Sequence, residues 1–253
     1  MASSMRMSGG CPRLGIRQAD KVLAISHTTL AALKNSFGVV DPLLVPMGIE
    51  SRMLRTKHRE ESSYDFVFVG RLVPQKRPLD FILALAKLRK KYNWQGKAVV
   101  IGDGPMKLEI EMKLAQLDLQ DRILLTGLVS IHQRDSLLAD SKLFVNCSER
   151  EGFSVATLEA FASGLPAIVA VPDDPEVFGV SEIAIDKKNC MFYPVGDINL
   201  LAEMMWFFIT TPGHVYEMAH AARQTAANYT WETIVQDFQD HFSHLLKPHS
   251  PNL

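Results

Sequence analysis

Short runs of apolar residues alternate with segments of helical spacing through most of the chain, and this alternation constrains the fold more than any other feature. The apolar runs lie at residues 66–69, 98–101, 123–125, 143–145, 167–171 and 191–193. Between them we expect helices at 78–92, 105–117, 131–138 and 155–162. Continuous apolar strands that alternate with helices form a parallel sheet that is covered on both faces. The sequence therefore predicts an α/β fold with a doubly wound, Rossmann-like domain.

The segments around this alternation predict how the rest of the chain is organised. Near the N-terminus we expect a strand at 21–26, a helix at 28–37 that begins after Ser26 or His27 and ends at Gly38, and a strand at 43–46. Three further helices are expected at 199–209, 213–228 and 231–246. The predicted parts are a disordered lead-in (1–16), a small N-terminal part (17–50), a linker (51–63), the main domain (64–246) and a tail (247–253).

Composition and charge exclude several classes of protein. A hydrophobic content of 47% and a charged content of 22% are typical of soluble globular proteins. The net charge of −1 argues against a nucleic-acid partner, and three scattered cysteines predict a reducing compartment without disulfides. No apolar run approaches the roughly 18 residues of a membrane-spanning helix, and the N-terminus lacks a signal-peptide core. We therefore expect a cytoplasmic protein, for which peripheral membrane contact stays open.

A basic loop follows the apolar run at 66–69. Gly70 permits a sharp exit from the strand, and Arg71 and Lys76 then place two cations in the loop. A forked guanidinium and a point-charge ammonium together suit a diphosphate. Such cations are often simply solvated, but ligands of doubly wound sheets bind beyond the carboxyl ends of the strands, where this loop lies.

Glycine-containing turns follow the next two apolar runs. Gly102-Asp103-Gly104-Pro105 comes after the second run, and Thr126-Gly127 comes after the third. Glycine permits unusual backbone angles, and Gly127 would let the backbone approach a flat ligand such as a base. Each turn alone is equally typical of a plain strand-to-helix connection. The spacing differs from the dinucleotide fingerprint, which argues against a nicotinamide-dependent dehydrogenase.

Two carboxylates, Glu151 and Glu159, bracket a turn that leads into an apolar helix at 155–162. Ser154 is expected to be the N-cap of this helix, and Phe153 is expected to pack beneath the turn. Helical side chains tilt toward the N-terminus, so Glu159 can lean back toward a cleft. Carboxylates there can accept hydrogen bonds from sugar or ribose hydroxyls, and the helix end can hold a phosphate. The alternative is a solvated Glu151 and a Glu159 on an exposed helix face.

Taken together and in this order, the motifs resemble the C-terminal, donor-binding half of a GT-B glycosyltransferase of the GT4 family, the glycosyl transferases group 1. The resemblance covers residues 64–245, and residues 19–26 and 45–49 resemble the last strand–helix–strand of the N-terminal half. The matching segments are Gly70-Arg71-Leu72-Val73-Pro74-Gln75-Lys76, Gly102-Asp103-Gly104-Pro105, Thr126-Gly127, Ser148, Glu151-Gly152-Phe153-Ser154, Leu158-Glu159-Ala160, Gly164-Leu165-Pro166 and Pro194-Val195-Gly196-Asp197.

The resemblance implies a retaining transferase that uses a UDP-, GDP- or ADP-sugar as donor and needs neither a cofactor nor a metal. The catalytic candidates are Arg71 and Lys76, which would hold the diphosphate, and Glu151, which would contact the donor sugar. Glu159 would accept hydrogen bonds from the ribose hydroxyls. The full set of donor-binding candidates is Gly70, Gly102, Gly127, Gly152, Phe153, Ser154, Val155, Leu158 and Glu159.

Some residues depart from the family pattern. Gln75 stands where Glu is common and Ser154 where Gly is frequent, while residues 172–179 replace a short Gly-rich turn and Glu182 takes the place of the acidic residue after it. Most of the N-terminal domain, which in this family supplies the acceptor site, has no counterpart in these 253 residues.

Two functions are therefore weighed. The first is a glycosyltransferase acting on an unknown sugar, lipid or protein acceptor. The second is a donor-binding module that is inactive alone and needs a missing N-terminal domain or a partner subunit for the acceptor site. A nucleotide-sugar epimerase is less well supported, because epimerases do not typically show the Arg/Lys and double-Glu signature.

Overall fold

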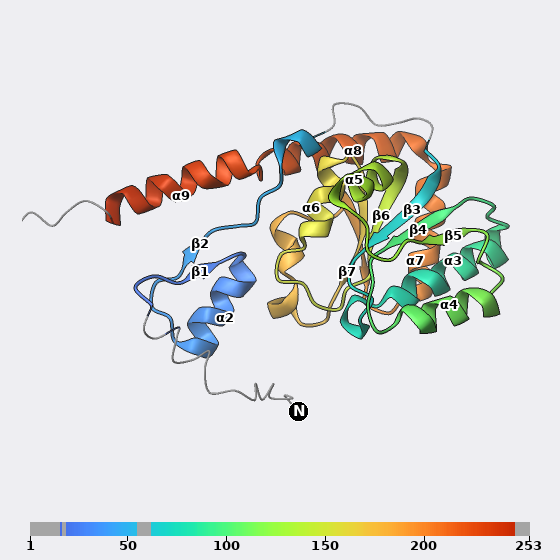
Figure 1. The fold of residues 1–253 in the computed structure, drawn as a ribbon, viewed down its shortest axis with the longest axis horizontal. Helices are drawn as coiled ribbons and strands as arrows, with labels where there is room; N and C mark the ends of the chain where they lie inside the picture. Colours follow the sequence, from blue (N-terminus) through green and yellow to red (C-terminus); the bar gives the residue numbers. More distant parts are fainter. Residues whose placement is uncertain (1–15, 17–18, 55–61, 246–253) are drawn as a thin grey trace, which may run out of the picture.

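A six-stranded parallel sheet forms the centre of the fold in the computed structural model, which describes residues 16, 19–54 and 62–245 (Figure 1). Its strands are β3 (Tyr64–Val69), β4 (Ala98–Ile101), β5 (Ile123–Leu125), β6 (Ser141–Asn146), β7 (Ala167–Val171) and β8 (Cys190–Pro194). The order across the sheet is β5-β4-β3-β6-β7-β8. In register, Phe66 of β3 lies opposite Ala98 of β4 and Leu143 of β6. The chain order therefore reverses between β3 and β6, and such a switch point is where doubly wound sheets bind ligands.

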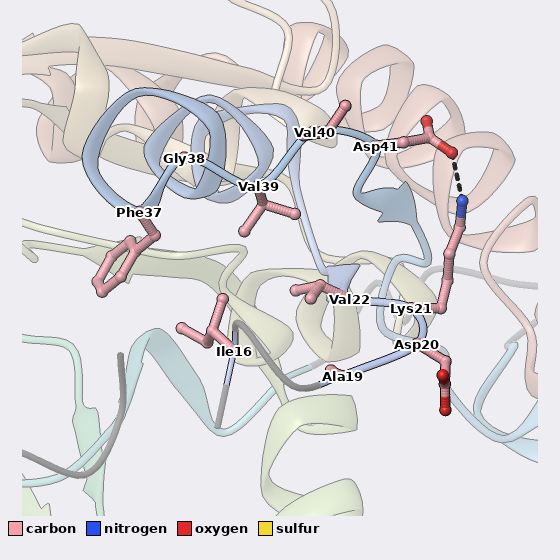
Figure 2. A pocket seen from close by; sticks show the side chains of 10 residues that line it. All are labelled: Ile16, Ala19, Asp20, Lys21, Val22, Phe37, Gly38, Val39, Val40 and Asp41. Carbon is pink, nitrogen blue, oxygen red and sulfur yellow. Dashed lines mark hydrogen bonds and ion pairs between the residues drawn. The ribbon is translucent and has the colours of Figure 1, made fainter. Parts of the chain in front are cut away.

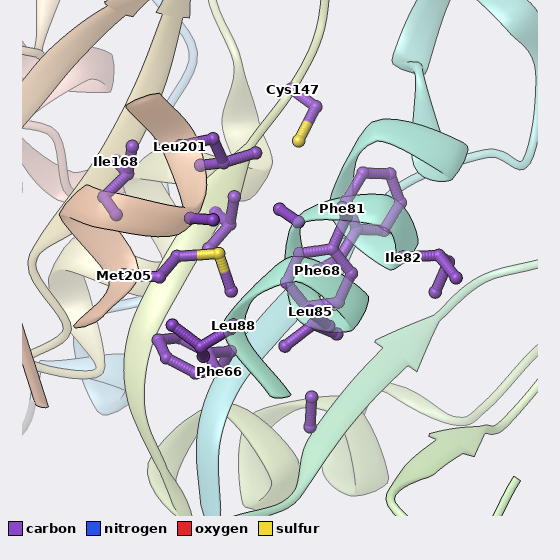
Figure 3. Packing of buried hydrophobic residues seen from close by; sticks show 14 of the residues in the cluster. Phe66, Phe68, Phe81, Ile82, Leu85, Leu88, Cys147, Ile168, Leu201 and Met205 are labelled. Carbon is purple, nitrogen blue, oxygen red and sulfur yellow. The ribbon is translucent and has the colours of Figure 1, made fainter. Parts of the chain in front are cut away.

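Helices cover both faces of the sheet, as continuous apolar strands require. On one face lie α3 (Pro78–Tyr92), α4 (Lys107–Gln116) and α7 (Ile198–Thr210), and on the other lie α5 (Ile131–Ala139) and α6 (Val155–Ala162), with α8 (Pro212–Ala227) packed on α6. Figure 3 shows the first core, where Phe66 and Phe68 of β3 pack with Leu85 and Met205. Val67, between the two phenylalanines, belongs to the second core.

A small lobe precedes the main domain. In it β1 (Leu23–Ala24) pairs in parallel with β2 (Leu43–Leu44), and α2 (His27–Phe37) connects them. Ser26 begins the helix, since its Oγ accepts a hydrogen bond from Thr29 N–H at 3.0 Å. Gly38 ends the helix in a left-handed conformation, with a φ of 68°. Figure 2 shows a hollow beside β1 and the end of α2, with Lys21 and Asp41 joined by an ion pair at its side.

The small lobe and the main domain are joined by two chain segments that run side by side. Ile49 N–H donates to the Tyr229 carbonyl at 2.8 Å, and the Ile49 carbonyl accepts from Trp231 N–H at 2.9 Å. Trp231 begins α9 (Trp231–Leu245), which extends away from the sheet (Figure 1). The Glu182 carboxylate also accepts a hydrogen bond of 2.5 Å from His27 N–H at the start of α2. Glu182, expected to replace an acidic residue of the family pattern, thus attaches the main domain to the small lobe.

The predicted fold class is confirmed, and several elements begin and end where the sequence predicts, among them α3, β4, β5, α6 and β7. The first strand is shorter than residues 21–26, because β2 pairs with it over two residues. Two short 3-10 helices, η3 (Pro175–Val177) and η4 (Gly179–Glu182), lie where the sequence offered no prediction. The predicted lead-in up to residue 15, the middle of the linker and the tail lie outside the described residues.

Candidate functional site

The loops that follow β3, β4 and β5 meet at the carboxyl edge of the sheet and are joined by backbone hydrogen bonds. Leu72 N–H, after β3, donates to the Asp103 carbonyl at 2.9 Å, and Gly102 N–H, after β4, donates to the Gly127 carbonyl at 3.1 Å. These bonds satisfy backbone groups that no strand or helix pairs. Three of the predicted motifs therefore form one connected surface.

Glycine is required where these loops approach most closely. Gly102 has a φ of 142°, and a Cβ at this position would lie 2.0 Å from the Gly70 carbonyl oxygen. Gly104 has a φ of 157°, and its Cβ would lie 2.5 Å from the Leu72 carbonyl oxygen. Any larger residue at Gly102 or Gly104 would force the two loops apart. These glycines thus have a packing role, whatever contacts they make with a ligand.

An ion pair between Lys76 and Glu151 lies at the switch point of the sheet. Lys76 ends the short helix η2 (Pro74–Lys76) after β3, and its Nζ lies 2.7 Å from Oε1 of Glu151, which follows β6. The side chains are only 20% and 11% exposed, respectively. Gln75 holds the two loops together, because its carbonyl accepts from Glu149 N–H at 3.1 Å and its Nε2 donates to the Arg150 carbonyl at 3.2 Å. The structure thus brings a predicted cation and a predicted carboxylate into direct contact.

The backbone of Glu151 is held from its other side by the segment that replaces the Gly-rich turn. Glu151 N–H donates to the Val177 carbonyl at 3.0 Å, and the Glu151 carbonyl accepts from Gly179 N–H at 2.8 Å. A Cβ on Gly179 would lie 2.2 Å from the Gly152 carbonyl oxygen, so the two segments are tightly packed. The η3–η4 segment therefore fixes the position of Glu151.

Arg71 and Arg77 belong to the same loop but differ in their partners. The Arg71 side chain is exposed and has no hydrogen bond or ion pair within the described part of the chain. Arg77 Nε donates to Asp80 Oδ2 at 2.6 Å, which raises the pKa of the guanidinium further. Arg77 is thus engaged at the start of α3, whereas the charge of Arg71 is uncompensated at the sheet edge.

Ser154 occupies the N-cap position of α6 as predicted, but its side chain does not cap the helix. Its backbone is left-handed, with a φ of 72°, which explains why glycine is frequent at this position in the family pattern. Ser154 Oγ instead lies 2.8 Å from Thr157 Oγ1 and accepts from Asn146 Nδ2 at 3.2 Å. This buried polar cluster lies directly beneath Glu151, whose Oε1 is 3.5 Å from Ser154 Oγ.

Glu159 is buried, at 9% exposure, and is paired with a cation that sequence reasoning missed. Its Oε1 lies 2.9 Å from Arg134 Nη1 of α5. Burial raises the pKa of Glu159 to about 7; the Arg134 charge opposes this rise and the Asp135 charge adds to it. The alternative of a Glu159 on an exposed helix face is wrong, while the prediction that Glu159 leans back toward a cleft stays a prediction.

The remaining candidates divide into core and surface positions. Phe153 and Leu158 are enclosed in the second core, and the Phe153 ring packs on Tyr229 with centroids 5.8 Å apart. Their side chains support the turn from below. Gly127 has a φ of 67° and lies beside Lys107 and Asp103, so its backbone remains at the edge of the sheet. No sequence pattern pointed to Arg134, because nothing in the spacing of α5 indicates that it meets α6.

A family model described as glycosyl transferases group 1 matches residues 51–228. The chain belongs to this family. The matched range contains all six strands of the central sheet and every strand-end loop described above. The resemblance inferred from the motifs is therefore confirmed.

Known glycosyltransferases resemble this chain over most of its length. N-acetyl-alpha-D-glucosaminyl L-malate synthase of Bacillus anthracis is 24% identical over 249 residues, which cover 93% of this chain and 62% of that protein. The crystal structure of a TarM mutant of S. aureus, in complex with Fondaparinux, alpha-GlcNAc-glycerol and UDP, has a TM-score of 0.78 at 22% identity, over 91% of this chain and 45% of TarM. HepE of Anabaena, in complex with UDP and glucose, has a TM-score of 0.78 at 21% identity, over 91% and 65%. This group 1 chain thus spans about half to two-thirds of their length.

Among the residues that the structure describes, no helix is long and apolar enough to cross a bilayer. Among the same residues, His, Cys, Asp and Glu side chains form no group of three or more that could hold a metal ion.

Proposed function

We propose that this chain binds a nucleotide-diphosphate sugar and forms the donor side of a retaining glycosyltransferase. The observation that carries the proposal is the meeting of Lys76 and Glu151 at the switch point of the sheet, 2.7 Å apart, with the unpaired Arg71 in the same loop. A diphosphate needs the cations, and a sugar needs the carboxylate. That TarM and HepE were crystallised with UDP supports a nucleotide ligand at this fold.

The diphosphate would be held by Arg71, Lys76 and the start of α6. The first amides of a helix have no partner within the helix, and the Ser154 side chain leaves those of α6 uncapped. The helix end also carries a partial positive charge. When the sugar leaves, negative charge grows on the nucleoside diphosphate, and these fixed positive groups stabilise it. No metal ion is needed in this proposal, because the two side chains supply the charge.

Glu151 and Glu159 would position the two ends of the donor. When a phosphate replaces Glu151 as the partner of Lys76, the Glu151 carboxylate becomes available to accept hydrogen bonds from the donor sugar. Glu159, on the next helix, would accept hydrogen bonds from the ribose hydroxyls, and the base would lie against the backbone near Gly127. The sugar would then be transferred with retention at its anomeric carbon to a sugar, lipid or protein acceptor.

A second function is favoured by the form of the small lobe. Its described part holds a two-stranded sheet and one helix, and an open hollow lies beside β1 (Figure 2). If the acceptor site needs a further domain or a partner subunit, this polypeptide would bind the donor without transferring the sugar.

Isothermal titration calorimetry with UDP, GDP and ADP tests donor binding by the 253-residue polypeptide. Removing one phosphate-binding cation, in Lys76→Met or Arg71→Met, is expected to weaken binding at least about tenfold, since charge-assisted hydrogen bonds contribute about 1.5–3 kcal/mol. The matched control is Arg122→Met, which removes an arginine that contacts Gln95 at the opposite edge of the sheet. Failure of all three nucleotides to bind would overturn the proposal.

Release of nucleoside diphosphate from the sugar donor separates the two functions. Steady transfer by the purified polypeptide would rule out the module that is inactive alone. Binding without transfer would favour that module.

A further inference from the structure

A row of alternating charges runs from Glu159 to the first residues of the predicted linker. Glu159 Oε1 lies 2.9 Å from Arg134 Nη1, and Arg134 Nη2 lies 3.1 Å from Asp135 Oδ1. Asp135 Oδ2 in turn lies 2.9 Å from Arg52 Nη1, in η1 (Ser51–Met53). The side chains of Glu159, Arg134 and Asp135 are 11%, 23% and 20% exposed, respectively. The row therefore links α6 to α5 by largely buried contacts, and α5 to η1 through Arg52, whose side chain is 45% exposed.

The guanidinium of Arg134 is oriented by two carboxylates at once. One terminal nitrogen faces Glu159 and the other faces Asp135, and a planar fork gripped at both ends loses its freedom to rotate. Arg134 Nε is buried and has no hydrogen-bond partner within the described part of the chain. An unpaired buried donor costs about 1–3 kcal/mol, so this arrangement is not the one that best satisfies Arg134 itself. It is an arrangement that directs positive charge onto Glu159.

Glu159 needs such a partner in order to accept hydrogen bonds. A protonated carboxyl group donates through its hydroxyl and loses acceptor sites, whereas an ionised one offers both oxygens. Oε1 is shared with Arg134, and Oε2 has no partner among the described residues. A pair of neighbouring hydroxyls, such as those of a ribose, would find a free oxygen and a part-free oxygen on a carboxylate of fixed orientation.

We propose that Arg134 is a positioning residue for the donor: it holds Glu159 in place and favours its ionised form, so that the carboxylate accepts hydrogen bonds from the ribose hydroxyls at neutral and higher pH. This inference rests on the proposed donor site and adds to it a residue that touches Glu159 rather than the nucleotide.

The electrostatics of the site agree with this role. Burial raises the pKa of Glu159 to about 7, with Arg134 as the charge that opposes the rise and Asp135 as the charge that adds to it. Within the described part of the chain, these two groups, both from α5, are the charges that act on Glu159. A neighbouring cation typically lowers a carboxyl pKa by about 1–3. Without Arg134, Glu159 would therefore be mostly protonated at neutral pH.

The test compares Arg134→Met with Arg134→Lys, which keeps the charge, and with Arg122→Met as a control far from the site. The first measurement needs no ligand: carboxyl carbon NMR follows the titration of Glu159, assigned by its loss in Glu159→Gln. We expect the midpoint of this titration to rise by about one pH unit or more in Arg134→Met, to rise less in Arg134→Lys, and to stay unchanged in Arg122→Met. An unchanged midpoint in Arg134→Met overturns the proposal, whether or not nucleotides bind.

The second measurement follows donor affinity against pH, with UDP-glucose as the probe because its diphosphate has no group that titrates near neutrality. Affinity in the wild-type protein should fall as the pH decreases through about 7, where Glu159 takes up a proton. In Arg134→Met the fall should begin at higher pH, and in Glu159→Gln the profile should be flat. With 2′-deoxy-UDP-glucose, Arg134→Met should cost less affinity than with the ribose form.

The outcomes distinguish a failure of the role proposed for Arg134 from a failure of the proposed donor site. If the wild-type protein binds UDP-glucose and Arg134→Met weakens it equally at every pH, Arg134 has only a structural role and the inference is wrong. If the wild-type protein binds no nucleotide, the donor site itself is refuted, while the titration still decides whether Arg134 keeps Glu159 ionised.

Discussion

Replacing Glu151 with glutamine should strengthen the binding of UDP while it weakens the contribution of the donor sugar. In the structure, Glu151 is paired with Lys76, with 2.7 Å between Oε1 and Nζ. A diphosphate must therefore compete with this carboxylate for the ammonium group. Glu151→Gln keeps the size of the side chain and an acceptor oxygen but removes the competing charge.

The size of the effect follows from the geometry of the pair. At 2.7 Å, and with an effective dielectric constant of about 20, two unit charges attract by roughly 6 kcal/mol. Most of this is offset by the hydration that both groups regain when they separate, and hydrogen bonds to charged groups contribute about 1.5–3 kcal/mol net. A glutamine amide retains part of that hydrogen bond. We therefore expect a gain of about 1.4 kcal/mol, which is about a tenfold lower Kd for UDP.

Calorimetry at one fixed, mildly alkaline pH measures this effect in four proteins: the wild type, Glu151→Gln, Lys76→Met and the double variant. If the gain arises from release of Lys76, it should disappear in the double variant, which retains no ammonium to release. The same titrations with UDP-glucose should show the opposite trend, because Glu151 can no longer contact the sugar as a carboxylate. The ratio of UDP to UDP-glucose affinity is then the most sensitive readout.

Weaker binding of UDP to Glu151→Gln would refute the reasoning, because it would mean that Glu151 assists the diphosphate and does not compete with it. A gain that persists in the double variant would also contradict it. In that case the added affinity would come from the general loss of negative charge at the sheet edge.

Three further predictions concern stability. The pKa of Glu159 is raised to about 7, so the folded protein binds a proton at this residue more tightly than the unfolded chain does. The stability of the wild-type protein relative to Glu159→Gln should therefore fall by about 3 kcal/mol as the pH rises from about 4.5 to 7. Urea titrations at several pH values measure this difference. Ser154→Gly should be more stable than Ser154→Ala by about 1 kcal/mol, because both lose the Oγ contacts but only glycine relieves the left-handed backbone; equal denaturation midpoints would contradict this. Gly102→Ala should destabilise the protein by about 3 kcal/mol or more, since its Cβ would lie 2.0 Å from the Gly70 carbonyl oxygen. Gly213→Ala, in helix α8 with open space around it, should melt no lower than the wild type.

The central sheet was predictable because the middle of most of its strands is buried on both faces and is therefore apolar. Residues 98–101 and 123–125 carry this pattern without interruption, and the structure places β4 and β5 on those residues. The edge of the small lobe was less predictable. Residues 21–26 are apolar enough for a full strand, but strand length there depends on pairing with β2, which the sequence pattern of one segment does not contain.

Some features of the candidate site could likewise be predicted from the sequence, and others depend on how distant segments pack. Strand ends and their loops are local features, so the positions of Arg71, Lys76 and Glu151 at one sheet edge followed from the parallel topology. The ion pair between Lys76 and Glu151 required knowing that β3 and β6 are neighbours. Arg134 was missed because its role depends on how α5 packs beside α6, and the residues of α5 show no pattern that marks one arginine. Ser154 was correctly predicted to occupy the N-cap position of α6. Its left-handed backbone and its hydrogen bonds to Asn146 and Thr157 could not be predicted from the local sequence.

The two glutamates differ in how readily a ligand could change their partners. Glu151 meets a lysine, which has a flexible stem and a compact point charge, and both residues lie at the carboxyl edge of the sheet. A phosphate can therefore take the ammonium without moving either loop. Glu159 meets an arginine that is gripped by two carboxylates, the second of which is itself paired with Arg52. Changing that contact would disturb three elements. The site would thus combine one exchangeable ion pair, at the diphosphate and sugar, with one fixed pair, at the ribose. Donor entry would then require only that Lys76 change its partner, because the carboxylate that meets the ribose would already be fixed in position.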